Sequence, residues 1–196
     1  MPNLNELKAT TSMVRTDMLD LMIDLETYGT KNDAAVASIG ACFFDPLTGE
    51  IGEKFHCIAK FDTVPEEGME ESTMKWWATQ SEDARKSLSS GSTHYNDMLS
   101  MFYTWVKDNA NLNSVKPWGN GSIFDMVILE SAFKSIDMNA PWKFWNVRDV
   151  RTIADLGMHV KVNYKDEPFT GIRHNALADA EHQAMYVSKI IGRLLS

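Results

Sequence analysis

Three apolar runs near the amino terminus constrain the fold of this chain more than any other feature. Residues 19–25, 34–44 and 51–61 each have the length and composition of a β-strand. The sequence DPLTGE at residues 45–50 carries turn signals and joins the second run to the third. We therefore expect the chain to open with three strands arranged as an antiparallel meander.

After residue 61 the apolar pattern changes to helical spacing. Ser72 and Ser81 are expected to cap two short helices. In residues 96–109 the apolar side chains recur on one helical stripe, which consists of Met98, Phe102, Trp105 and Val106. Three more helices are predicted at residues 123–136, 149–158 and 178–195, and a short strand, despite Pro117, at 114–120. This order predicts an α/β domain in three layers, with a mixed sheet flanked by helices.

The organisation of the chain indicates a single domain. Its 196 residues contain no internal repeat, low-complexity stretch or long linker, so we expect one domain at residues 18–196 after a polar extension at residues 1–17. No apolar run approaches the roughly 20 residues that cross a bilayer, and no signal peptide is recognisable. Cys42 and Cys57 lie in apolar runs, which favours buried thiols in a reducing compartment. We therefore expect a cytoplasmic protein.

The net charge of −8 argues against a nucleic-acid partner, because phosphate binding usually depends on a basic surface. One arrangement removes this objection. Acids that are clustered around divalent cations form a site that is locally positive once the cations are bound. The function therefore depends on whether the acidic residues form such a cluster.

Asp24 and Glu26 interrupt the first apolar run, in LMIDLETYGT. Side chains two residues apart in a strand project from the same face, so these carboxylates are expected to lie together. The alternative is that Asp24 ends the strand and Glu26 lies in a solvated turn. Two carboxylates 4 Å apart repel by about 4 kcal/mol at an effective dielectric near 20. A divalent cation such as Mg²⁺, which prefers carboxylate oxygens, would offset this repulsion.

Asp125 has a local and a functional interpretation. If Ser122 is the N-cap, Asp125 is the third helical residue, where an acid forms a capping box and suits the helix dipole. However, Asp125 also lies on the apolar stripe that contains Ile128 and Leu129, and this stripe should face the core. The sequence pattern leaves both interpretations open.

His174 and Asp179 form the third group, in IRHNALADAEHQA. With Asn175 as the N-cap, these two residues occupy the positions that meet in a hydrophobic staple, so their side chains should be neighbours. The alternative is that His174 only caps the start of the helix and that Asp179 only interacts favourably with the helix dipole. Taken together, the three groups supply several carboxylates and one base that works near neutral pH, which hydrolysis of a phosphodiester by two metals requires.

These residues resemble the DEDDh branch of the DnaQ-like 3′→5′ exonucleases, which have the RNase H-like fold. Several further segments are similar to the small exonuclease family that includes phage exonuclease A and a mycobacterial exoribonuclease domain. They are MIDLETYGT, SIGACFFDPLTGEIG, STMKWWATQSEDAR, WGNGSIFDMVIL, PWKFWNVRDVRT and HNALADAEHQA. The resemblance extends from about Met18 to Met185, and all five catalytic positions match it.

The resemblance implies a role for each of these positions. Asp24, Glu26 and Asp179 would bind a first Mg²⁺ or Mn²⁺ ion, Asp24 would bridge to a second, and Asp125 would act largely through metal-bound water. His174 would be the general base. The implied substrate is the 3′ end of single-stranded DNA or RNA, which would be degraded to nucleoside 5′-monophosphates.

Five residues are candidates for contacts to the substrate: Thr27, Trp76, Trp77, Asn120 and Arg148. Thr27 is placed either to contact a hydroxyl of the terminal sugar or only to shape its turn. Asn120 either lines the site beside Asp125 or makes hydrogen bonds only within its own turn. On a helix the two tryptophans point about 100° apart, so we expect one to face the substrate and the other the core. Arg148 either contacts phosphate or pairs with a neighbouring acid, and for Arg151 the structural interpretation is favoured.

Three alternatives to an exonuclease stay open: an RNase H-like endonuclease, a non-catalytic nucleic-acid-binding module, and a phosphodiesterase of small nucleotides. The sequence also leaves open the choice between DNA and RNA and the oligomeric state, for which a homodimer is one alternative. The resemblance is compatible with a phage-encoded protein that acts in the host cytoplasm.

Overall fold

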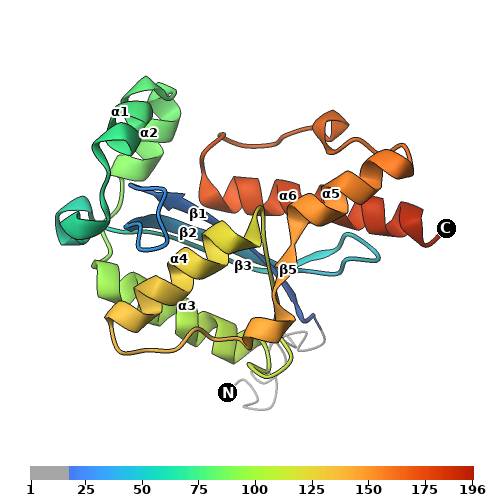
Figure 1. Ribbon diagram of the computed structural model, residues 1–196, viewed down its shortest axis with the longest axis horizontal. Coiled ribbons are helices and arrows are strands. Elements are labelled where there is room, and N and C mark those ends of the chain that lie inside the picture. The colour runs from blue at the N-terminus through green and yellow to red at the C-terminus, as the bar shows by residue number, and fades with distance from the viewer. Residues whose placement is uncertain (1–17) are drawn as a thin grey trace, which may run out of the picture.

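The computed structural model describes residues 18–196, so the predicted extension at residues 1–17 lies outside the described part. A five-stranded sheet in the order β3-β2-β1-β4-β5 is packed between helices (Figure 1). Its strands are β1 (Asp20–Thr27), β2 (Val36–Phe44), β3 (Ile51–Ile58), β4 (Lys116–Gly119) and β5 (Arg148–Asp149). The first three strands are antiparallel, whereas β4 and β5 run parallel to β1. The expected mixed sheet with an opening meander is therefore confirmed, and β5 was not predicted.

Helices cover both faces of this sheet. They are α1 (Glu71–Thr79), α2 (Glu82–Ser89), α3 (Tyr95–Asn109), α4 (Ser122–Ser135), α5 (Val150–His159) and α6 (Ala176–Leu194). Short 3₁₀ turns occupy Phe61–Thr63, Glu66–Gly68, Phe144–Asn146 and Tyr164–Asp166. The helices α5 and α6 lie along one face and α3 and α4 along the other, while α1 and α2 form a pair beyond the end of β1 (Figure 1).

The alternation of side chains along β1 divides the core in two. Leu21, Ile23 and Leu25 pack on the side of α3 and α4, within the larger apolar cluster. Met22 packs on the opposite side, with side chains of α6 such as Ala184 and Val187. Asp24 and Glu26 continue the face of Met22, so they lie on the side of the sheet that α6 covers. The strand therefore presents its acids to one particular helix.

Two of the predicted helix caps were wrong. The N-cap of α1 is Glu70 and not Ser72, and the Glu70 carboxylate instead accepts a hydrogen bond of 2.8 Å from the Thr30 hydroxyl. The N-cap of α4 is Gly121, whose φ of 97° lies in the left-handed region that glycine adopts without strain. Ser81 and Asn175 do cap α2 and α6, since their side chains accept hydrogen bonds from Ala84 N and Ala178 N.

Two further expectations concern the chain as a whole. Both cysteines, Cys42 and Cys57, are buried and free, in agreement with the prediction. Within residues 18–196, no helix combines the length and the apolar character that crossing a membrane requires.

Candidate active site

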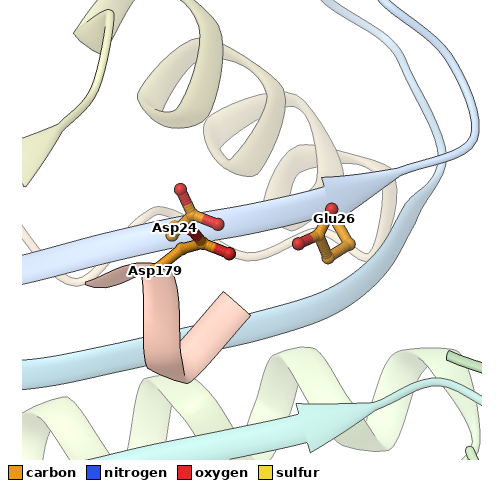
Figure 2. Close-up of side chains that lie close together, drawn as sticks. All are labelled: Asp24, Glu26 and Asp179. Carbon is orange, nitrogen blue, oxygen red and sulfur yellow. The ribbon is translucent and has the colours of Figure 1, made fainter. Parts of the chain in front are cut away.

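Three carboxylates from distant parts of the sequence meet at one edge of α6. Asp24 and Glu26 from β1 and Asp179 from the first turn of α6 each offer an oxygen, and these oxygens lie within 4.8 Å of one another (Figure 2). We call these three residues the acid cluster. Glu26 is buried, while Asp24 and Asp179 are partly exposed. The expectation that Asp24 and Glu26 share a face and lie near Asp179 is therefore confirmed.

Gly40 allows α6 to approach the sheet closely enough to complete the cluster. It is the register partner of Asp24 on β2. A Cβ atom at this position would lie only 2.0 Å from the carbonyl carbon of Ala176, the first residue of α6. Because the side chain is absent, the start of α6 lies directly on the sheet beside Asp24, and Asp179 follows within one helical turn.

Asp125 approaches the same region from α4. It lies in the first turn of α4, and its side chain is 4% exposed. A Cβ atom at Gly119, the last residue of β4, would be 3.0 Å from Asp125 Oδ2, so the carboxylate is packed against the end of that strand. Asp125 is not one of the three residues whose oxygens lie within 4.8 Å of one another, but its charge raises the pKa of Asp24.

Burial raises the pKa of all four carboxyl groups, and the charges of neighbouring acids raise it further for Asp24 and Glu26. Burial raises the pKa of Asp24 well above its ordinary value, and the charges of Asp125, Glu26 and Asp179 raise it further. Burial, together with Asp179 and Asp125, raises the pKa of Glu26 to about 8. Burial also raises the pKa of Asp125 to about 7 and that of Asp179 above its ordinary value. A cation among these groups would favour their ionised forms.

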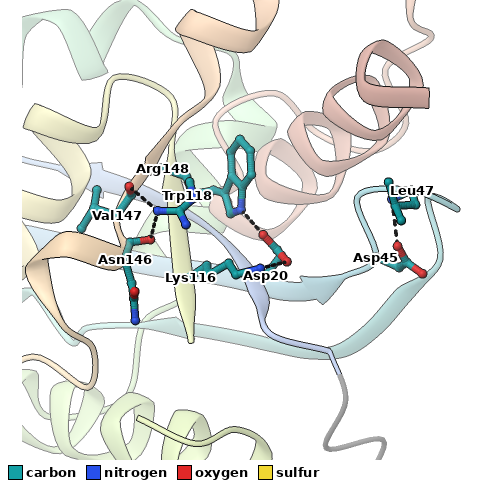
Figure 3. Close-up of polar contacts among 8 residues, drawn as sticks. All are labelled: Asp20, Asp45, Leu47, Lys116, Trp118, Asn146, Val147 and Arg148. Carbon is teal, nitrogen blue, oxygen red and sulfur yellow. Dashed lines mark hydrogen bonds and ion pairs between the residues drawn. The ribbon is translucent and has the colours of Figure 1, made fainter. Parts of the chain in front are cut away.

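The chemistry of these ligand atoms fits a hard divalent cation. Mg²⁺ and Mn²⁺ prefer carboxylate oxygens, and the site offers them from four side chains with no lysine or arginine within 4 Å among the described ion pairs. Asp20, on the same face of β1, provides a contrast. Its carboxylate accepts a hydrogen bond of 2.8 Å from Trp118 Nε1 and lies 3.5 Å from Lys116 Nζ (Figure 3). Glu26 has no such partner among residues 18–196.

His174 lies at the start of α6 in a constrained conformation. Its φ of 63° lies in the left-handed region, which is uncommon for a residue other than glycine. The His174 main-chain N–H donates a hydrogen bond of 2.9 Å to Asp179 Oδ2. The imidazole instead packs edge-on against Trp76 and Trp77, with ring centroids 5.1 and 6.1 Å apart. His174 and Asp179 are therefore neighbours, as predicted, but the hydrogen bond to Asp179 comes from the main chain of His174 and not from its side chain.

A pocket of 450 Å³ opens beside the acid cluster. Its wall contains both predicted tryptophans and the last three residues of β1. The full lining is Leu25, Glu26, Thr27, Gly29, Thr30, Ser72, Thr73, Trp76, Trp77 and Phe124. Trp77 is buried and its Nε1 donates a hydrogen bond of 2.9 Å to the Thr27 carbonyl, whereas Trp76 is 44% exposed. As expected, one tryptophan belongs to the core and the other is open to solvent.

The other three candidates for substrate contacts have local partners. The Thr27 hydroxyl donates a hydrogen bond of 2.6 Å to the Gly29 carbonyl, so it shapes the turn as well as lining the pocket. Asn120 Oδ1 accepts a hydrogen bond of 3.4 Å from Arg151 Nε. Arg148, the first residue of β5, donates hydrogen bonds of 2.9 and 3.1 Å to the carbonyls of Asn146 and Val147 at the end of the preceding 3₁₀ turn (Figure 3).

Two residues near the site were not among the site candidates that the sequence analysis selected. Gln183 donates a hydrogen bond of 2.8 Å from Nε2 to Asp24 Oδ1. Its spacing of four residues from Asp179 places both on one side of α6, which could have indicated it. Arg151, for which the structural interpretation was favoured, is exposed and lies close enough to Asp125 to lower the pKa of that carboxyl group.

Comparisons with known proteins agree with this architecture. The model of the 3′-5′ exoribonuclease Rv2179c-like domain matches residues 19–191. An exodeoxyribonuclease of Enterobacteria phage T4 is 31% identical over an alignment that covers 69% of this chain and 70% of the phage protein.

Solved structures of low sequence identity share the fold. The nuclease domain of 3′hExo, a DEDDh family member bound to rAMP, is 12% identical with a TM-score of 0.55, covering 88% of this chain and 90% of that chain. S. pombe Pop2p in its Mg²⁺- and Mn²⁺-bound form is 13% identical with a TM-score of 0.57, covering 91% and 85%. The fold is therefore that of the RNase H-like exonucleases. By its sequence, the chain belongs to the family of Rv2179c-like 3′-5′ exoribonuclease domains, and it is a hydrolase of phosphodiester bonds.

Proposed function

We propose that this protein removes nucleoside 5′-monophosphates from the 3′ end of single-stranded nucleic acid with the help of two Mg²⁺ or Mn²⁺ ions. The observation that carries the proposal is the acid cluster, in which three carboxylate oxygens from β1 and α6 lie within 4.8 Å of one another. Buried groups of like charge at this separation are stable mainly when a cation neutralises them. The exonuclease names of the matching family model and of the phage relative support the same reaction class.

The four acids would hold the cations. Asp24, Glu26 and Asp179 would hold one ion. Asp24 would also hold the second, with Asp125 acting largely through water bound to the ion. When bound, the two ions would neutralise the phosphate and stabilise the attacking and leaving oxygens of the displacement. Mg²⁺ and Mn²⁺ are the expected ions, because each site is composed of carboxylate oxygens alone.

His174 would act as the general base. In this role its imidazole would accept a proton from the water whose oxygen forms the new bond to phosphorus. The bond to the 3′-oxygen of the preceding nucleotide would break, and that oxygen would take up a proton from solvent to become the new 3′-hydroxyl. The hydrogen bond from the His174 main chain to Asp179 ties this residue to the acid cluster. The edges of Trp76 and Trp77 restrict the position of the ring.

The pocket beside the acid cluster would receive the terminal nucleotide. Glu26 and Thr27 line its inner end and would lie near the terminal sugar, and the exposed ring of Trp76 would stack against a base. Arg151 is better placed than Arg148 for a phosphate contact, since it lies beside Asp125 whereas Arg148 is bound to two neighbouring carbonyls. We therefore propose Arg151 as the phosphate ligand.

Digestion of 5′-labelled single-stranded DNA and RNA in Mg²⁺ and in Mn²⁺ tests the proposal. A ladder that shortens stepwise from the 3′ end is expected, and the Asp24→Ala variant should give none. Internal cuts would indicate an endonuclease, and binding that persists in chelator without hydrolysis would indicate a non-catalytic module. The relative rates on the two substrates assign the preference between DNA and RNA.

A further inference from the structure

Gln183 is the neutral residue in closest polar contact with the acid cluster. It is 5% exposed, and its Nε2 donates a hydrogen bond of 2.8 Å to Asp24 Oδ1. Its other polar atom, Oε1, is buried without a hydrogen-bond partner among the described residues. Among the described residues, the side chain of Gln183 therefore makes one hydrogen bond, to Asp24, and its amide oxygen is left unpaired.

Packing alone does not explain an amide at this position. Burying a polar atom without a partner costs free energy, and such atoms are rare in folded proteins. The adjacent core positions on α6 are apolar, including Ala180, Ala184 and Val187, so an apolar residue of similar length would suit the same environment. The single feature that an apolar residue cannot reproduce is the hydrogen bond to Asp24.

A neutral donor has a specific advantage beside a cation site. It fixes the orientation of one carboxylate oxygen without supplying a positive charge that would compete with the cation. Lysine or arginine at the same place would neutralise Asp24, and glutamate would add to the repulsion that Asp125, Glu26 and Asp179 already exert on it. The other oxygen, Asp24 Oδ2, accepts no hydrogen bond from the described residues and is free to bind an ion.

We infer that Gln183 is a positioning residue, which holds the Asp24 carboxylate in the orientation that binds the divalent cations. The inference rests on the proposed function, because it assumes that Asp24 is a metal ligand. Residues that orient metal ligands in this way typically change metal affinity or activity roughly 10- to 100-fold when they are replaced.

Isothermal titration of the full-length chain with Mn²⁺ and with Mg²⁺ tests this inference directly. Gln183→Met keeps the length of the side chain and removes the donor, and it is expected to weaken cation binding roughly 10- to 100-fold. Ser188→Ala is the matched control, because Ser188 is also buried on α6 but donates its hydroxyl to the Ala184 carbonyl at 2.8 Å. It should bind the cations as tightly as the parent.

Hydrolysis measured over a range of Mn²⁺ concentrations adds a second readout. For Gln183→Met, the rate should approach that of the parent when Mn²⁺ is saturating, and the KM for the oligonucleotide should not change. A Gln183→Met variant that binds Mn²⁺ with the affinity of the parent overturns the inference. If that variant does not fold, Gln183→Leu, which also removes the donor and adds no charge, carries the same test: it should bind Mn²⁺ more weakly than the parent, and unchanged affinity overturns the inference.

The two levels of the hypothesis fail differently. A parent chain that takes up neither Mn²⁺ nor Mg²⁺ refutes the proposed function itself. A parent that binds and hydrolyses normally, beside a Gln183→Met variant with unchanged affinity, refutes the role of Gln183 alone.

Discussion

Replacing Glu26 with glutamine removes one charge from the acid cluster with almost no change in side-chain shape. In the metal-free protein this change should increase the free energy of unfolding at alkaline pH. Glu26 is 7% exposed, and burial with the charges of Asp179 and Asp125 raises its pKa to about 8 from an ordinary value of 4.5. Between these two values the folded state binds more protons than the unfolded chain, so stability decreases as the pH rises.

The size of the effect follows from the two pKa values. Each pKa unit corresponds to 1.36 kcal/mol, so ionised Glu26 destabilises the metal-free fold by on the order of 5 kcal/mol above pH 8. Below about pH 4.5 the group is protonated in both states, and the penalty disappears. Glutamine carries no charge at any pH, so the Glu26→Gln variant should lose this part of the pH dependence and gain stability at about pH 9 by a few kcal/mol.

Urea unfolding in chelator at about pH 6 and at about pH 9 measures this difference. The parent should be less stable at the higher pH, and the difference in stability between the two pH values should be smaller for Glu26→Gln. Added Mg²⁺ should stabilise the parent more than the variant, because it binds the ionised cluster. Glu53→Gln, a change at an exposed glutamate of β3, is the control and should follow the parent. A parent that is as stable at pH 9 as at pH 6 without metal would refute the reasoning.

Three other changes test separate parts of the site. His174→Ala should lower the rate of hydrolysis roughly 10²- to 10⁴-fold while Mn²⁺ binding, measured by titration, is retained. Gly40→Ala should reduce both stability and Mn²⁺ affinity, because its Cβ would lie 2.0 Å from the Ala176 carbonyl carbon and would displace α6; urea unfolding and titration measure the two effects. Trp76→Ala should raise the KM for oligonucleotides by an amount equivalent to about 1–3 kcal/mol of lost stacking, with a smaller effect on dinucleotides.

The features that the sequence predicted well depend on local periodicity. The alternation of side chains along a strand is independent of the rest of the fold, so it placed Asp24 and Glu26 on one face correctly. The same holds for the buried stripe of α3 and for the cap at Asn175. The roles of these residues in catalysis stay predictions, and the resemblance to the DEDDh exonucleases supplied them.

The features that the sequence analysis missed depend on contacts between distant segments. β5 has two residues, Arg148 and Asp149, and exists because they pair with β4, so no local pattern marks it. The cap of α1 was misplaced because Glu70 takes its partner from Thr30, forty residues away. Gln183 was overlooked because a neutral amide on a helix suggests no chemistry until its partner Asp24 is known.

Two acids on β1, Asp20 and Asp24, lie in different environments. Asp20 and Asp24 occupy the same face of one strand, four residues apart. Asp20 is paired with Trp118 and Lys116, which is how a protein satisfies a buried carboxylate for stability alone. In the described part of the chain, Asp24 has only the amide of Gln183 as a hydrogen-bond partner, and the charges of three other carboxylates act on it. Since the chain is able to supply partners for an acid on this strand, their absence around Asp24 and Glu26 argues that these groups are kept available for cations.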